Sequence, residues 1–344
     1  MTKTSPGRFF EDYRVGQLLV HAVPRTVTDG DRALYTALYP ARFAVASSDE
    51  FARACGLKRS PIDDMAAFHL VFGKTVPDVS LNAVANLGYA EGRFLAPVYP
   101  GNTLTAVSEV IGLRETSSRR SGVVWVRTTG SNEAGEPVLS YVRWVMVRKR
   151  DVDAPAPDPV VPALAAAVPA LELAPPPGLD FTRYDDALAG ERWRWDDYAI
   201  GERIDHLDRV TIEEAEHMLA TRLWQNTARV HFDATHREDG KRLIYGGHVI
   251  SLARALSFNG LANAQFVAAI NAGAHANPCF AGDTVGAWSE VLDKAATLAP
   301  GVAALRLRTV AVRSGAPDFA RFGADGKYLP EVLLDLDYWA LVPR

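Results

Sequence analysis

The sequence contains an internal repeat, and this repeat limits the folds open to the chain more than any other feature. An aromatic and acidic segment that begins at Phe10 (FEDYRVGQ) returns at Trp195 as WDDYAIGE, 185 positions later. A second segment, PVYPGNTL from Pro97, returns at Pro278 as PCFAGDTV, 181 positions later. Two blocks in the same order at nearly the same spacing indicate two diverged copies of one domain.

A segment dense in proline and alanine separates the two copies. We therefore expect an N-terminal domain over residues 1–152, a linker over 153–190 and a C-terminal domain over 191–344. A chain of 344 residues is long enough for two domains of ordinary size, each with its own hydrophobic interior. The proline-rich segment cannot form a regular core, so we expect it to be extended.

The predicted elements follow the same order in both copies. Each copy has a short strand, a helix with acidic residues in its first turn, an irregular loop and a second, more apolar helix. We place the second helix at about 63–76 in the first copy and 247–259 in the second. Alternating, valine-rich strands follow at 104–112, 122–131 and 138–149, and again at 284–292, 302–313 and 331–342. This pattern predicts an α+β fold in which each copy wraps an antiparallel sheet around a central helix.

Composition argues against several classes of function. No apolar run approaches the roughly 20 residues that cross a bilayer, and the N-terminus lacks the features of a secretion signal, so a cytoplasmic protein without a membrane partner is expected. A net charge of −4 and a pI near 6.1 argue against nucleic acid as a partner. Cys55 and Cys279 lie outside any CxxC pair and are expected to be packed thiols. No histidine or cysteine cluster has the spacing of metal ligands, so we expect no metal site.

The element order and the PxxxGDT turn at Pro278 resemble the hotdog fold of the MaoC-like (R)-specific enoyl-CoA hydratases, here in a tandem, double hotdog arrangement. Longer strings, such as LSYVRWVMVRKRD from Leu139 and YGGHVISLARALSFNGL from Tyr245, resemble the members of this family that act on mesaconyl-CoA. The resemblance covers essentially the whole chain. It implies a lyase that reversibly hydrates mesaconyl-CoA to β-methylmalyl-CoA and uses no cofactor, since coenzyme A is part of the substrate.

Two alternatives remain open at this point. The hotdog fold also serves thioesterases, so an acyl-CoA thioesterase is one alternative and a non-catalytic acyl-CoA-binding protein is the other. All three functions need an acyl-CoA ligand. Further assembly into a homo-oligomer is optional, because a double hotdog already contains the pairing that single-domain relatives reach by dimerising.

The family's catalytic loop has the pattern G-D-x-N-P-(I/V/L)-H, and its match here is QNTARVH at residues 225–231. His231 keeps the family's histidine, and we expect it to take a proton from water as general base. Asn226 stands where the family has aspartate; an amide transfers no proton but can orient the water. A carboxylate there would also repel a substrate carboxylate by about 4 kcal/mol at 4 Å. The alternative is that Asp233, Asp63 or Asp64 supplies the missing acid.

Other residues near this loop are candidates for binding the substrate. Arg229 and Arg222 could pair with a substrate carboxylate. Gly246 and Gly247 open the central helix of the second copy, where backbone amides could bind the thioester oxygen as negative charge develops. Their neighbours Tyr245 and His248 are also expected to contact the substrate.

The first copy lacks the residues for this chemistry. A spacing of 185 positions puts Ala46 opposite His231 and Ala41 opposite Asn226. Alanine can neither donate nor accept a proton. We therefore expect one active site per chain, with the first copy degenerate and helping to shape the acyl pocket.

Overall fold

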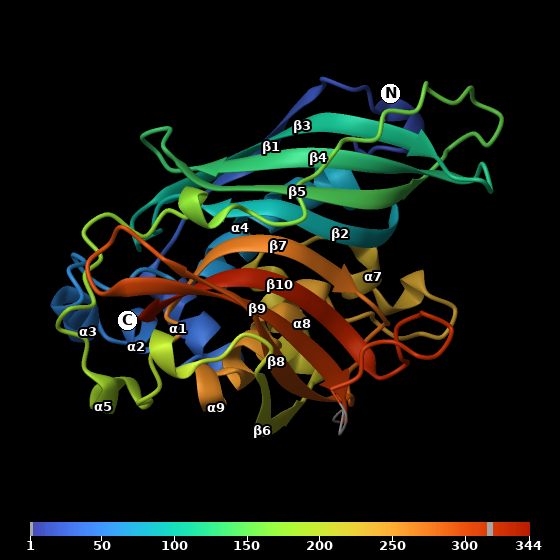
Figure 1. The fold of residues 1–344 in the computed structure, drawn as a ribbon. Coiled ribbons are helices and arrows are strands. Elements are labelled where there is room, and N and C mark those ends of the chain that lie inside the picture. The colour runs from blue at the N-terminus through green and yellow to red at the C-terminus, as the bar shows by residue number, and fades with distance from the viewer. Residues whose placement is uncertain (1–2, 315–318) are drawn as a thin grey trace.

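The computed structural model describes residues 3–314 and 319–344. Within these residues, ten strands form one antiparallel sheet in the order β1-β3-β4-β5-β2-β7-β10-β9-β8-β6 (Figure 1). The first copy contributes β1 to β5 and the second contributes β6 to β10, so the order of one half mirrors that of the other. Strands β2 and β7 join the two halves at the centre of the sheet. The predicted α+β fold with a repeated sheet is confirmed.

The strands of the first copy are β1 (Leu18–Thr26), β2 (Ala83–Phe94), β3 (Thr103–Glu115), β4 (Ser121–Ser131) and β5 (Pro137–Arg148). Those of the second are β6 (Arg203–Thr211), β7 (Phe266–His275), β8 (Thr284–Ala296), β9 (Val302–Arg313) and β10 (Val332–Pro343). The helices of the first copy are α1 (Asp29–Leu38), α2 (Ala44–Ser47), α3 (Asp49–Ala54) and α4 (Asp64–Thr75). Those that follow are α5 (Asp186–Ala189), α6 (Glu214–Leu223), α7 (Arg229–Phe232), α8 (Gly246–Leu256) and α9 (Phe258–Leu261).

The central strands β2 and β7 are absent from the strands predicted above. Strand β7 contains four alanines and β2 contains Gly88 and Gly92, and both residue types are depleted in strands. The glycines are needed for close packing: a Cβ atom on Gly88 would lie 2.3 Å from the ring of Trp144, and one on Gly92 would lie 2.9 Å from the Cβ of Ile270. Tertiary packing, rather than local propensity, therefore forms the strands that join the copies.

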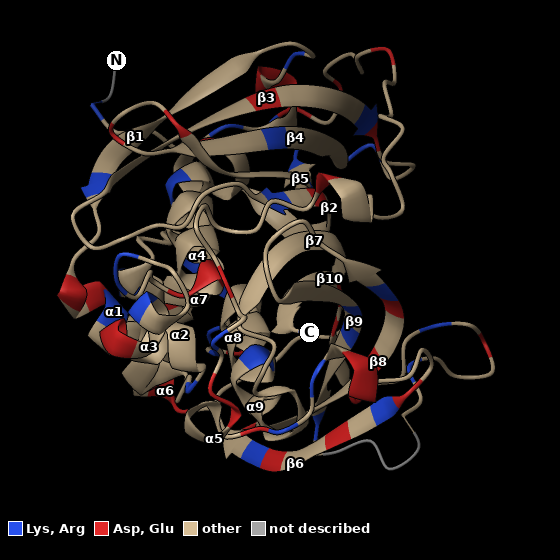
Figure 2. Ribbon diagram, turned by 60° about the vertical axis from the view of Figure 1, so that its left-hand side comes forward, with Lys and Arg blue, Asp and Glu red and all other residues tan. Residues whose placement is uncertain are grey.

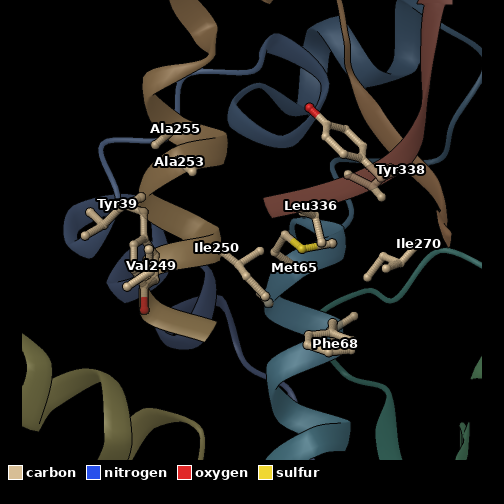
Figure 3. Close-up of a cluster of buried hydrophobic side chains, with 14 of the residues drawn as sticks. Tyr39, Met65, Phe68, Val249, Ile250, Ala253, Ala255, Ile270, Leu336 and Tyr338 are labelled. Atoms are coloured by element: carbon tan, nitrogen blue, oxygen red, sulfur yellow. The ribbon is translucent and has the colours of Figure 1, made fainter. Parts of the chain in front are cut away.

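The two predicted central helices are α4 and α8, and both lie against the same face of the sheet (Figure 1). Figure 3 shows them side by side, with Met65 and Phe68 of α4 and Ile250 of α8 directed toward Leu336 and Ile270 of the sheet. The largest buried cluster takes residues from both copies. The two copies thus share one hydrophobic core.

The segment between β5 and β6 has little regular structure, yet it is anchored along its length. The side chains of Val168, Phe181 and Tyr184 are buried. The Val168 N–H donates to Asn271 Oδ1 at 2.8 Å, and the indole N–H of Trp339 donates to the Val168 carbonyl at 3.0 Å. Val160 forms a β-bridge with Leu113 of β3, so the extended linker packs against both halves of the sheet.

Basic and acidic side chains are interspersed rather than gathered by sign. Figure 2 shows both signs along β6 and mixed around the helices α1 and α6. No helix in the described residues is long and apolar enough to cross a membrane. Cys55 and Cys279 are buried and unbridged, as the sequence predicts.

Candidate active site

A cavity of about 300 Å³ lies between the two copies. The first copy contributes wall residues from α4, β2 and β5, and the second contributes the loop before α7, the start of α8 and the end of β7. The polar or aromatic side chains of this wall include Phe72, Tyr89, Arg143, Asn226, His231, Tyr245 and His275. The cavity therefore brings residues of the predicted catalytic loop together with residues of the first copy.

His231 lies on the short helix α7 and lines the cavity. Its Nδ1 is 2.7 Å from the carbonyl oxygen of Leu243, so Nδ1 carries the proton and Nε2 keeps its lone pair. No hydrogen bond in the described residues reaches Nε2. Burial lowers the pKa of His231 to about 4, although the bond to Leu243 acts in the opposite direction. The imidazole is thus neutral near pH 7, the state in which a general base accepts a proton.

Asn226 is buried in the cavity wall, five positions before His231. Gln225, just before it, adopts a left-handed backbone conformation with φ of 53°, which turns the chain after α6. The side-chain Oδ1 of Asn226 accepts the N–H of Ala228 at 3.1 Å. The Nδ2 group is the part of this amide that remains to donate to a molecule in the cavity.

Gly246 is the first residue of α8 and lines the cavity. The amides of a first helical turn have no partner within the helix, and the helix dipole makes this end favourable for negative charge. A Cβ atom on Gly246 would lie 2.4 Å from Cε1 of His275, so the position has no room for a side chain. Gly247 lies behind the wall, where a Cβ atom would be 2.4 Å from the ring of Tyr245. Of the two predicted glycines, the structure brings Gly246 to the cavity.

The remaining predicted substrate contacts fall in different places. Tyr245 is buried in the cavity wall, and its hydroxyl is 3.3 Å from Nδ1 of His69. His248 points into the protein interior and bonds the Tyr39 hydroxyl and a Glu216 carboxylate oxygen, at 3.0 and 3.1 Å. Neither His248 nor the two predicted arginines belong to the described wall of the cavity.

Those two arginines have different surroundings. Arg222 is exposed in the last turn of α6. Arg229 is half-buried and donates to Asn82 Oδ1 at 3.3 Å and to the carbonyl of Pro6 at 3.5 Å. The arginine that lines the cavity is instead Arg143.

Asp233, Asp63 and Asp64, the carboxylates that could replace the aspartate of the catalytic pattern, form hydrogen bonds away from the cavity. Asp233 is exposed and accepts the N–H of Thr235 at 2.9 Å. Asp63 caps α4 by accepting the Met65 N–H, and Asp64 accepts the Val267 N–H at 2.7 Å. These carboxylates lie outside the described cavity wall.

The family model of mesaconyl-CoA hydratase matches residues 2–314. This chain belongs to the mesaconyl-CoA hydratase family. A mesaconyl-CoA hydratase of Cereibacter sphaeroides is 73% identical over 342 residues, which are 99% of this chain and 100% of that relative.

Solved structures agree with this family assignment. A MaoC domain protein dehydratase from Chloroflexus aurantiacus superposes with a TM-score of 0.98 at 58% identity, over 100% of this chain and 99% of that chain. A protein of Mycobacterium tuberculosis described as a double hotdog fold has a TM-score of 0.75 at 23% identity, with 98% of each chain covered. The predicted resemblance to MaoC-like hydratases and the double hotdog fold are confirmed.

The first copy of this family member keeps the backbone of the catalytic loop without its side chains. Helix α2 lies 185 positions before α7 and has the same four-residue length. Ala46 therefore occupies the place of His231, and Ala41 that of Asn226.

The sequence analysis assigned no role in the site to Arg143, Tyr89 or His275. Tyr89 and Arg143 belong to the wall because β2 and β5 of the first copy face the second copy's site, and His275 reaches it from the end of β7. The one local signal was a charged residue inside an otherwise apolar strand, since Arg143 lies between Val142 and Trp144. Charged side chains are almost never fully buried unless they are paired, so an arginine within an apolar strand indicates a functional residue.

Proposed function

We propose that this protein reversibly adds water to the C=C bond of mesaconyl-CoA to give β-methylmalyl-CoA, as a hydro-lyase. The observation that carries the proposal is the neutral imidazole of His231, whose Nε2 is unbonded in a cavity that also holds Asn226 and the first amide of α8. The family membership and the names of the relatives support the choice of substrate.

In the proposed reaction, His231 and Asn226 act on a water molecule in the cavity. Nε2 of His231 removes a proton from the water, and the Nδ2 group of Asn226 donates a hydrogen bond that orients the water oxygen. The hydroxide equivalent adds to the β-carbon of the enoyl thioester. The proton held on His231 then passes to the α-carbon, which restores the neutral imidazole and completes a syn addition.

Negative charge develops on the thioester oxygen as the C–O bond forms. We assign its stabilisation to the Gly246 N–H at the N-terminus of α8, where the amide is oriented in advance. Acid–base chemistry of this kind balances without a metal or redox cofactor, and coenzyme A enters as part of the substrate.

The test of the proposal is a pair of assays on the purified protein with mesaconyl-CoA. Hydration removes the absorbance of the enoyl thioester without releasing thiol, whereas a thioesterase releases coenzyme A thiol. We expect loss of absorbance with no thiol. Thiol release that matches substrate loss would overturn the hydratase proposal, and tight binding without turnover would favour a non-catalytic acyl-CoA-binding protein.

His231→Ala tests the proposed base. We expect kcat to fall by about 10²- to 10⁴-fold, because the water then loses its proton acceptor. His236→Ala is the matched control, since His236 is an exposed histidine nearby in the chain. The unfolding midpoints of both variants should stay near that of wild type. Full activity in His231→Ala would remove this residue from the mechanism.

A further inference from the structure

Arg143 in β5 carries a buried charge without an acidic partner. Its side chain has no solvent exposure, and none of the described ion pairs includes it. Its Nη2 group donates to the Thr75 hydroxyl at 2.7 Å and to the Ser80 hydroxyl at 3.3 Å. Within the described residues, the Nε and Nη1 atoms have no hydrogen-bond partner. The guanidinium is therefore only partly satisfied, by neutral groups.

Such an arrangement is costly in a protein that binds nothing at this position. A buried charge is normally paired or fully hydrogen-bonded, because its desolvation penalty is several kcal/mol. The guanidinium carbon lies 4.2 Å from the centroid of the Phe72 ring, and this cation–π contact offsets part of the desolvation penalty. Nε and Nη1 are thus the donors of this guanidinium that neutral protein groups do not use.

The position of Arg143 links this charge to the active site. Arg143 lines the cavity and is the direct cross-strand partner of Tyr89 in β2, so their side chains share one face of the sheet. The Tyr89 hydroxyl is 3.0 Å from Nε2 of His275, whose ring lies against Gly246. The guanidinium therefore belongs to the same continuous wall as the amide that we assign to the thioester oxygen.

A second set of contacts connects Arg143 to the proposed base. Phe72, beneath the guanidinium, packs against the ring of Tyr245 with 5.6 Å between centroids. Tyr245 in turn packs against the ring of His231 at 5.7 Å. Arg143 of the first copy and His231 of the second thus face one cavity from opposite copies.

We propose that Arg143 binds the free carboxylate of the acyl group and selects acyl-CoA substrates that carry one. This inference rests on the proposed function and adds its specificity determinant. In mesaconyl-CoA the free carboxylate is attached to the carbon that receives hydroxide, so its binding group must lie close to the proposed base. Arginine suits this role because it stays protonated in proteins and matches carboxylates well.

The uncharged Asn226 fits the same arrangement. An aspartate in this wall would be an internal acid able to compete for the guanidinium of Arg143. With asparagine there, the positive charge stays available to the substrate. The asparagine in place of the MaoC-like aspartate and the unpaired arginine thus have one explanation.

Kinetics with two substrates test the inference. Mesaconyl-CoA carries the free carboxylate and crotonyl-CoA does not. In Arg143→Met we expect kcat/KM to fall by at least about 100-fold for mesaconyl-CoA and by less than about 10-fold for crotonyl-CoA. Arg143→Lys keeps the charge without the planar fork and should recover part of the preference. Equal losses on both substrates in Arg143→Met would overturn the inference.

Binding of saturated thioesters, which have no C=C bond to hydrate, separates this inference from the proposed function. Succinyl-CoA and butyryl-CoA share the coenzyme and differ in a terminal carboxylate, so calorimetry of both measures carboxylate recognition without turnover. We expect wild type to prefer succinyl-CoA and Arg143→Met to lose that preference. A wild type without the preference, or an Arg143→Met that retains it, would overturn the role of Arg143 even if hydration is observed.

Arg127→Met is the matched control for these measurements. Arg127 lies one strand away in β4 and is already paired with Glu91 at 2.7 Å, outside the described cavity wall. This control should keep the wild-type preference. The unfolding temperature of Arg143→Met should equal or exceed that of wild type, because methionine removes an uncompensated buried charge. Loss of preference in Arg127→Met as well would show that the effect is not specific to Arg143.

Discussion

Asn226 stands where the MaoC-like catalytic pattern G-D-x-N-P-(I/V/L)-H has aspartate. Its Oδ1 is occupied by the N–H of Ala228, so the side chain presents a donor to the cavity. A carboxylate in its place would present a negative charge to a substrate that carries its own. Asparagine can therefore donate a hydrogen bond to the substrate, whereas aspartate would repel the substrate carboxylate. This difference comes in addition to their different capacity for proton transfer.

Asn226→Asp tests this difference. We expect kcat/KM for mesaconyl-CoA to fall by about 10²- to 10³-fold, since repulsion between two carboxylates costs about 4 kcal/mol at 4 Å and an effective dielectric near 20. Crotonyl-CoA, which has no free carboxylate, should be affected less. Loss of enoyl-thioester absorbance measures both rates. Hydration of mesaconyl-CoA by Asn226→Asp at the wild-type rate would show that charge is not the reason for asparagine.

At the scale of elements, the catalytic loop of the second copy is held by a helix of the first. Gly73 in α4 faces the backbone between α6 and α7, and a Cβ atom there would lie 1.8 Å from the carbonyl oxygen of Trp224. The Trp224 ring also stacks on Tyr39, with 6.5 Å between centroids. Asn226 follows two positions later, so the contact between α4 and this loop sets its position.

Gly73→Ala should therefore reduce activity although Gly73 lies outside the described cavity wall. The added methyl group must push the loop from α4, and displacement of a catalytic group by about 1 Å can cost on the order of 10²-fold in rate. Gly30→Ala is the control, because Gly30 is an exposed residue in the first turn of α1. The unfolding midpoint distinguishes a displaced loop from a destabilised fold. Wild-type kcat in Gly73→Ala would contradict this account.

At the scale of the whole molecule, five histidines in the interior or in the cavity wall are neutral near pH 7. Burial lowers the pKa to about 3 or about 4 in each of five cases: His69, His206, His217, His231 and His275. In the unfolded chain each imidazole has a pKa near 6.5. The unfolded chain therefore binds protons at these positions at pH values where the folded chain does not.

Acid should therefore destabilise the protein. The contribution of these histidines is fully present above pH 6.5 and is lost as pH falls toward 4, by up to about 1.4 kcal/mol per pH unit for each. Burial raises the pKa of Asp63 and Asp64, so these two carboxyls favour the folded state on acidification. They oppose the effect of the five histidines. Denaturant unfolding between pH 7 and 5 should show a falling free energy of unfolding. His206 lies outside the described cavity wall. His206→Asn should reduce the slope of the free energy of unfolding against pH by the amount that one bound proton contributes, up to about 1.4 kcal/mol per pH unit. A flat or rising free energy on acidification would contradict this prediction.

The sequence by itself determined the repeat, the fold class, the central helices and the outer strands, because these depend on local pattern. Alternation of valine and polar residues predicts β3 to β5 and β8 to β10, and an aspartate cap followed by apolar residues predicts α4. The loop with His231 and Asn226 was also visible, since its spacing is a property of the chain alone.

Only the tertiary structure decided which residues meet in the cavity. Strands β2 and β7 are rich in glycine and alanine, and they pair because their small residues let the two copies approach closely. That pairing brings Arg143 and Tyr89 of the first copy opposite His231, more than 80 positions away along the chain. Burial then lowers the pKa of His231 and leaves the charge of Arg143 without an acid. Desolvation and contact between distant residues arise from packing, so no local pattern could have predicted them.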